Sequence, residues 1–159
     1  MFRAPALTAV ALIVMGALLW AVDARARSDR ALSSSTRRDA LLIGCAQAFA
    51  LIPGVSRSGA TITAGRALGF DRSSAATFSF MMCMPIIAAA AVLKVPKALA
   101  QGGVPLPLVV AVVTAAVSSA LAITVLLRFV QSRGLGVFAL YRFALGAAVL
   151  ALVAHRAAQ

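Results

Sequence analysis

The chain has 159 residues, of which 62% are hydrophobic and 12% are charged, about half the ~25% charged share of soluble domains. A soluble domain of this length has too little interior to bury so much apolar surface, which excludes soluble enzymes, coiled coils and disordered chains. Fifteen Lys and Arg residues against four acidic ones give a net charge of +11. The arginines lie at the edges of apolar runs, so we expect membrane lipids, and not nucleic acid, to be their partners.

The first apolar run covers residues 4–22 and contains no charge. At ~1.5 Å per residue it is long enough to cross a ~30 Å hydrocarbon core. A cleaved signal peptide is the alternative, because Ala24-Arg25-Ala26 loosely resembles a cleavage site. The length of the run and the acidic Asp23 before that site favour a retained span.

A polar, arginine-rich connector at 23–39 leads into two short apolar runs. The region 40–70 is broken at 53–59 by Pro53-Gly54-Val55-Ser56-Arg57-Ser58-Gly59, and neither half can cross a bilayer alone. It therefore predicts a broken, re-entrant helix pair.

Three further runs, 74–93, 104–127 and 135–154, are each long enough to span the membrane, and proline and glycine residues between 94 and 107 predict a break. The predicted fold class is an all-α integral membrane protein. It forms one domain over residues 1–159, with four transmembrane helices and one re-entrant pair.

The basic residues favour the re-entrant arrangement over a crossing one. If the pair enters and returns, nine of the thirteen basic residues outside the apolar cores lie on one side and four on the other. If the pair crosses, the split is eight to five. The sharper asymmetry is preferred and assigns the 23–39 connector to the cytoplasm.

The break itself carries the chemistry. An arginine inside a membrane is costly and marks a site by default, and the second half-helix begins near Gly59 with unpartnered N–H groups at its positive dipole end. We therefore expect an anion cradle made by the side chains and backbone of Gly54, Ser56, Arg57, Ser58, Gly59, Ala60 and Thr61. So many donors suit a phosphate or diphosphate better than a single carboxylate.

Other readings remain open for these and other polar residues. The break is also compatible with a Pro-Gly kink in a packing helix, although this explains Arg57 poorly. Arg142, inside the last apolar run, either snorkels to the interface or lines a cavity. Arg66 is expected near the cytoplasmic edge with little influence on the cradle. Cys45 and Cys83 are interpreted as small buried hydrophobic residues.

Residues 44–61, Gly-Cys-Ala-Gln-Ala-Phe-Ala-Leu-Ile-Pro-Gly-Val-Ser-Arg-Ser-Gly-Ala-Thr, resemble the second signature of the undecaprenyl-diphosphatase family, the bacitracin-resistance membrane phosphatases. The similarity continues through residues 69–80, Met84-Pro85 and Tyr141-Arg142. The resemblance implies an inverted-repeat fold of which this chain is the second half. It also implies hydrolysis of undecaprenyl diphosphate to the monophosphate in the bacterial inner membrane, which recycles the peptidoglycan lipid carrier and confers bacitracin resistance.

By the same resemblance, Ser56, Arg57 and Thr61 match catalytic residues of the family. A divalent cation, Mg or Ca, is expected from the family, but this chain offers no visible ligands for it. The glutamate-containing and Ser-Ser-x-Gly-His motifs of the family have no counterpart here, and Gln47 stands where a glutamate is expected. The chain is therefore interpreted as a C-terminal portion: a fragment, a misplaced start or one half of a split gene.

Three functions stay open at this point. The first is a phosphatase that is inactive alone and is completed by a missing N-terminal half or by a homo-oligomer. The second is a non-enzymatic transporter or binding module for the lipid carrier, since broken helices at mid-membrane are also typical of transporters. The third is a non-functional remnant.

Overall fold

A computed structural model describes residues 5–100 and 105–157. In these ranges the chain forms seven α-helices: α1 (Pro5–Arg25), α2 (Arg37–Ala48), α3 (Arg57–Ala67), α4 (Arg72–Met81), α5 (Cys83–Ala100), α6 (Leu106–Arg133) and α7 (Gly136–Ala157). They include no strand, only an isolated bridge between Arg30 and Phe70. Four segments are long and apolar enough to cross a membrane: Pro5–Arg25, Arg72–Lys97, Leu106–Ser132 and Gly136–Arg156. The all-α, multi-pass membrane class is thereby confirmed.

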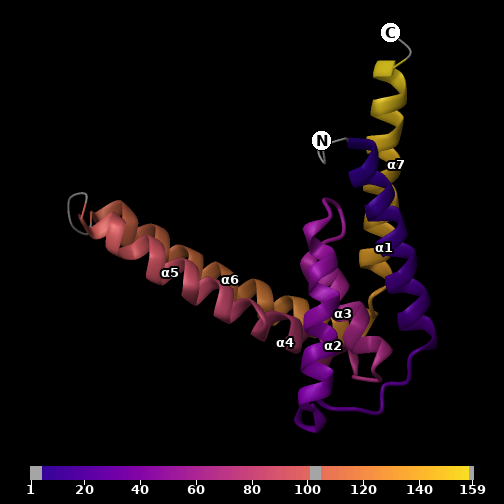
Figure 1. Cartoon of the computed structure of the whole chain (residues 1–159), viewed down its shortest axis with the longest axis horizontal. Helices are drawn as coiled ribbons and strands as arrows, with labels where there is room; N and C mark the ends of the chain where they lie inside the picture. The colour runs from indigo at the N-terminus through magenta and orange to yellow at the C-terminus, as the bar shows by residue number, and fades with distance from the viewer. Residues whose placement is uncertain (1–4, 101–104, 158–159) are drawn as a thin grey trace.

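Helices α1 and α7 run side by side along most of their length (Figure 1). Two glycines permit this close approach, because a Cβ at Gly146 would lie 2.6 Å from Ile13 and a Cβ at Gly16 would lie 3.2 Å from Phe143. Small residues serve the same purpose at many membrane helix interfaces, where backbones must approach without a hydrophobic driving force.

The broken pair consists of α2 and α3, joined by a 3₁₀ turn at Phe49–Leu51 and an irregular segment after it. Thr36 begins α2 with a capping box, in which it exchanges hydrogen bonds with Asp39. Helix α3 runs back beside α2, so the start of α2 and the end of α3 lie at the same end of the molecule (Figure 1). Arg30 and Phe70 are bridged there, as a re-entrant path requires.

This geometry predicts the outcome of cysteine labelling across the membrane. In a chain with its own cysteines replaced, Ser35→Cys and Ser73→Cys are expected to react with a membrane-impermeant maleimide from the same face, because they stand just before and just after the returning pair. Intact and inverted vesicles provide the measurement. Labelling of the two positions from opposite faces would contradict the re-entrant arrangement.

The second predicted span differs in detail from the structure. Residues 74–93 lie within the single spanning segment Arg72–Lys97, but α4 ends at Met81, Met82 caps it, and α5 begins at Cys83. The predicted break at 94–107 begins too early, since α5 continues through Pro96 to Ala100. Residues 101–104 of that break lie outside the described ranges. Pro105 then stands as the N-cap of α6.

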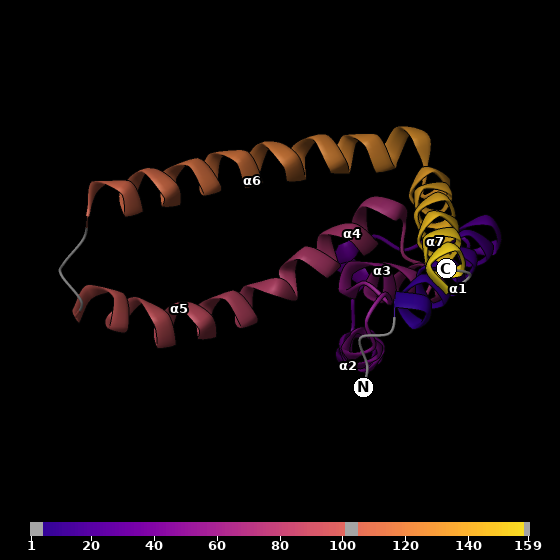
Figure 2. The ribbon, with the colours of Figure 1, turned by 90° about the horizontal axis from the view of Figure 1, so that it is seen from above.

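Helices α5 and α6 extend away from the other helices as a hairpin whose arms stand apart (Figure 2). Nearly every described side chain of both helices is exposed, and none of the spanning window of α6 is buried. The other helices and the last turns of α6 form the body of the molecule, which is held together by two small apolar clusters, one around Leu19, Val130 and Leu135 and one around Ile43 and Phe70. Helix α3 packs against α1, α2 and α4, which fixes its first turn in the middle of the body.

Candidate phosphate-binding site

The first turn of α3 is the centre of the site. Ser56 is its N-cap, and its side chain accepts a hydrogen bond from the Gly59 N–H at 3.3 Å. Ser56 is also the one non-glycine residue of the described chain with a positive φ, at 55°. Such a conformation costs roughly 1–3 kcal/mol and is found preferentially at functional sites. The strain and the cap together fix the direction in which α3 begins.

The free backbone donors lie two residues earlier than the helix start near Gly59 that the sequence indicated. The N–H of Gly59 donates to the Ser56 side chain, and the N–H of Ala60 donates to the Ser56 carbonyl oxygen at 3.0 Å. Gly59 and Ala60 therefore do not offer backbone donors to a ligand. The N–H groups of Arg57 and Ser58 have no hydrogen-bond partner within the described residues. They are the two that point out of the helix start, at its positive dipole end.

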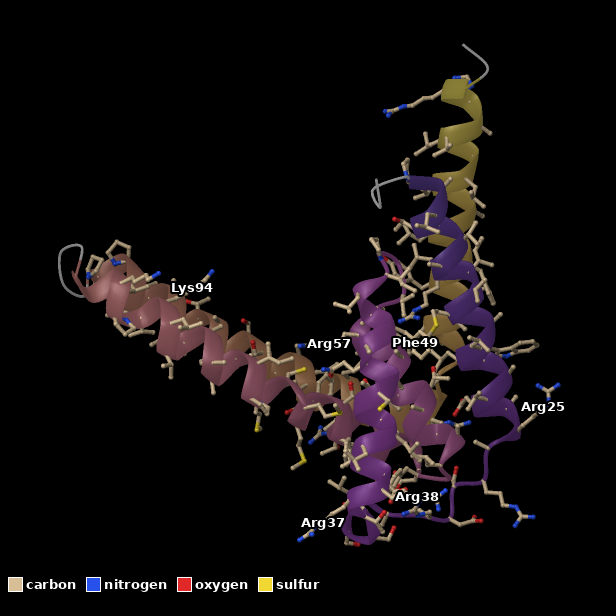
Figure 3. All side chains as sticks on the ribbon, in the orientation of Figure 1. Arg25, Arg37, Arg38, Phe49, Arg57 and Lys94 are labelled. Carbon is tan, nitrogen blue, oxygen red and sulfur yellow. The ribbon has the colours of Figure 1, made fainter. Side chains whose placement is uncertain are left out.

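Arg57 is exposed and lies on the side of the body that faces the α5–α6 hairpin (Figure 3). Its Nη2 donates to the Sγ of Cys83 at 2.7 Å. Cys83 is half-buried and Cys45 is exposed, so neither is the buried hydrophobic residue that the sequence suggested. A guanidinium whose one side-chain partner is a weakly accepting thiol remains available for a stronger acceptor.

The other expected site residues have mostly structural partners. The Thr61 side chain is buried, and its hydroxyl bonds to backbone carbonyls of its own helix and to Ser79 at 2.7 Å. Gly54, with φ of 96°, packs against α1, because a Cβ there would lie 2.4 Å from the Thr8 carbonyl oxygen. Gly54 thus has a packing role against α1, and its phosphate contact stays a prediction. Ser58 is exposed beside Arg57.

Arg142 joins the site from α7, a residue for which the sequence left two interpretations open. Its guanidinium lies where a side chain on Gly59 would be, with Nη2 2.3 Å from the position of a Cβ. Its Nη1 is buried without a hydrogen-bond partner. Arg142 borders a cavity of about 100 Å³ that Ser58 and Gly59 also line. The structure therefore supports the cavity interpretation of Arg142.

The contact between Gly59 and Arg142 predicts the effect of a small substitution. Gly59→Ala is expected to displace the guanidinium at little cost to the fold, because the clash falls on the end of a flexible side chain. We expect Gly59→Ala and Arg142→Ala each to weaken binding of a prenyl diphosphate about tenfold, the loss of one charge-assisted hydrogen bond. Gly44→Ala is the control, since its Cβ meets nothing closer than 3.9 Å. Equal affinities of all three variants in equilibrium binding would exclude Arg142 from the site.

Arg66 lies beside the 23–39 connector, the segment that the sequence assigns to the cytoplasm, and its side chain is buried there. Its side chain is 1% exposed and makes an ion pair with Asp23 at 2.8 Å. Its remaining donors reach the Ser28 hydroxyl and carbonyl oxygens of the α1 end, the connector and Phe70. Asp23 also binds Arg72 at 3.0 Å. This cluster joins α1, α3 and α4 and gives Arg66 a structural role, while its small influence on the cradle stays a prediction.

Three aspartates of the described chain make side-chain contacts, and all of these contacts lie away from the cradle. Asp23 is bound by two arginines and Asp71 caps α4. Asp39 forms two hydrogen bonds with Arg30, and this guanidinium holds the pKa of Asp39 well below its usual range. In residues 5–100 and 105–157, no group of three or more His, Cys, Asp or Glu side chains is placed to hold a metal ion.

Fold and site together define a multi-pass membrane protein in which two arginines, Arg57 and Arg142, meet at the start of one helix. The family model described as bacitracin resistance protein BacA matches residues 1–148, and the chain belongs to this family. Among curated relatives, it is 55% identical over 155 residues to the undecaprenyl-diphosphatase of Gemmatimonas aurantiaca, which covers 98% of this chain and 58% of that relative. It is 43% identical to the undecaprenyl-diphosphatase of Pelotomaculum thermopropionicum, with the same coverage. The chain therefore spans about three-fifths of the length of these relatives.

Proposed function

We propose that this chain forms the diphosphate-binding part of an undecaprenyl-diphosphatase, which hydrolyses undecaprenyl diphosphate to undecaprenyl phosphate and phosphate. The observation that carries the proposal is the convergence of two guanidinium groups on one helix start. Arg57 begins α3, and Arg142 reaches it from α7 with a buried, unpartnered Nη1. The N–H groups of Arg57 and Ser58, which have no partner within the described residues, lie at the same helix start. A diphosphate supplies several anionic oxygens, which matches this number of donors.

The chemistry follows from where charge moves in the reaction. Water attacks the terminal phosphorus, the P–O bond of the anhydride breaks, and negative charge shifts to the bridging oxygen that leaves with the lipid phosphate. Fixed guanidinium and N–H donors stabilise this charge without reorganising, and they are most effective where water is scarce. Arg57, with its planar fork, suits the phosphate oxygens better than a lysine would.

The residues near the cradle do not supply the acid–base part of the reaction. Activation of the attacking water needs a general base, which is worth about 10²–10⁴ in rate. In the described ranges, the three aspartates with side-chain partners are held by arginines or helix caps. The side chains around the cradle also do not fit the divalent cation expected from the family, since carboxylate oxygens are its usual protein ligands. We propose that the base and any cation ligands come from a second half of the enzyme, in the same chain or in a partner.

The setting of the reaction is part of the same proposal. A lipid-linked substrate requires a site reachable from the bilayer, and the exposed apolar helices α5 and α6 suit such a setting. We propose the bacterial inner membrane as the location, with recycling of the peptidoglycan lipid carrier and bacitracin resistance as the consequences.

The experiment is a paired measurement on the purified 159-residue chain. We expect it to bind farnesyl diphosphate in detergent and to release almost no phosphate from undecaprenyl diphosphate. A chimera in which this chain replaces the matching part of the Gemmatimonas aurantiaca relative should restore turnover. Turnover by the chain alone at the rate of the chimera would contradict the division of roles. A chimera that binds the diphosphate but does not hydrolyse it would favour a binding or transport module.

A further inference from the structure

The first turn of α3 is closed into a ring of hydrogen bonds with α4 and α5. Arg57 Nη2 donates to Cys83 Sγ at 2.7 Å, and the Cys83 thiol donates to the Ser79 carbonyl oxygen at 3.4 Å. The Ser79 hydroxyl lies 2.7 Å from Thr61 Oγ1, which in turn bonds to the Arg57 carbonyl oxygen at 3.0 Å. The ring thus begins and ends on Arg57.

The directions of these bonds are set by the available protons. Thr61 has one hydroxyl proton, which lies between the carbonyl oxygens of Arg57 and Ser58, so Ser79 donates to Thr61. The Cys83 sulfur accepts from the guanidinium while its proton points to Ser79. Serine can reproduce both roles of this thiol, whereas alanine can reproduce neither. Ser79 and Thr61 are both buried, which fixes the inner side of the ring.

We propose that Cys83, supported by Ser79, is a positioning residue for Arg57. The inference rests on the proposed function, because it assigns Arg57 to the diphosphate. A long exposed arginine has many rotamers, and ordering it on a ligand costs conformational entropy. The thiol removes part of this cost by holding the guanidinium in place beforehand. Because a thiol is a weak acceptor, the anionic oxygens of a diphosphate displace it easily.

Equilibrium binding of farnesyl diphosphate to the full 159-residue chain tests the proposal. Cys83→Ala is expected to weaken binding about five- to tenfold, Cys83→Ser by less than twofold, and Cys45→Ala not at all, since Cys45 lies elsewhere on α2. On an Arg57→Ala background, Cys83→Ala should cause no further loss. A loss that is equal on both backgrounds would mean that Cys83 acts on the fold and not through Arg57, and would overturn the proposal. Undiminished binding by Cys83→Ala would also overturn it.

A second measurement needs no ligand and separates this inference from the proposed function. In a Cys45→Ala chain, a maleimide should react several-fold faster with Cys83 when Arg57 is also replaced by alanine, because the guanidinium no longer covers the sulfur. Arg128→Ala, an exposed arginine of α6, should leave the rate unchanged. If Arg57→Ala speeds the reaction of Cys83 but the chain with Arg57 binds no diphosphate, the contact between Arg57 and Cys83 is upheld and the proposed function is contradicted. Equal rates with and without Arg57 would overturn the positioning role.

Discussion

Arg57→Ala is expected to abolish nearly all diphosphatase turnover in the chimera with the Gemmatimonas aurantiaca relative. The guanidinium stands at the start of α3 beside two free N–H groups, where the proposed function has it stabilise charge on the transferring phosphoryl group. Arginines in this role contribute roughly 10³–10⁵ in rate to phosphoryl transfer. We therefore expect a loss of at least about a thousandfold, measured as phosphate release from undecaprenyl diphosphate.

Conservative and neighbouring substitutions sharpen this expectation. Arg57→Lys keeps the charge but loses the two-pronged fork, so it should not restore turnover. Ser56→Ala and Thr61→Ala should each lose part of the rate, through the helix cap and through the buried bond to Ser79. Arg25→Ala, an exposed residue at the end of α1, is the matched control. Near-normal turnover by Arg57→Ala would show that the site lies elsewhere.

Arg66→Ala is expected to cost about 3–5 kcal/mol of stability, the usual result of breaking a buried ion pair. The substitution removes one partner of Asp23 and leaves several buried carbonyl oxygens without donors. The measurement is thermal unfolding in detergent, and Arg128→Ala, exposed on α6, is the control. The same melting temperature for both variants would contradict the structural role of Arg66. The melting temperature of Arg66→Ala also shows whether a loss of activity in this variant comes from unfolding.

The sequence predicted the parts of the fold that depend on local patterns. Apolar runs of spanning length and the Pro-Gly break at 53–59 located the helices, because membrane helices need long uncharged stretches and irregular backbone there needs a special setting. The junction at Met82 was not predictable in this way, since it lies inside an unbroken apolar run. Pro96 misled the prediction, because α5 continues through this proline.

For the site too, the sequence predicted what neighbouring residues form, but not the contacts between residues far apart in the chain. The motif around Arg57 was readable because its residues are consecutive. The contacts that Gly59 makes with Arg142 and that Arg66 makes with Asp23 join residues far apart in the chain, which no local pattern records. One signal for Arg142 was present, namely an arginine well inside an apolar run. For Arg66, no local pattern indicated that its side chain would be buried in an ion pair with Asp23.

The most direct test of the account is a structure of the chain with a prenyl methylene-bisphosphonate, which cannot be hydrolysed. The account predicts that one phosphonate lies within hydrogen-bonding distance of the N–H groups of Arg57 and Ser58, with the Arg57 guanidinium moved from Cys83 onto its oxygens and Arg142 Nη1 paired. A bisphosphonate bound away from the first turn of α3, with Arg57 still on Cys83, would contradict it.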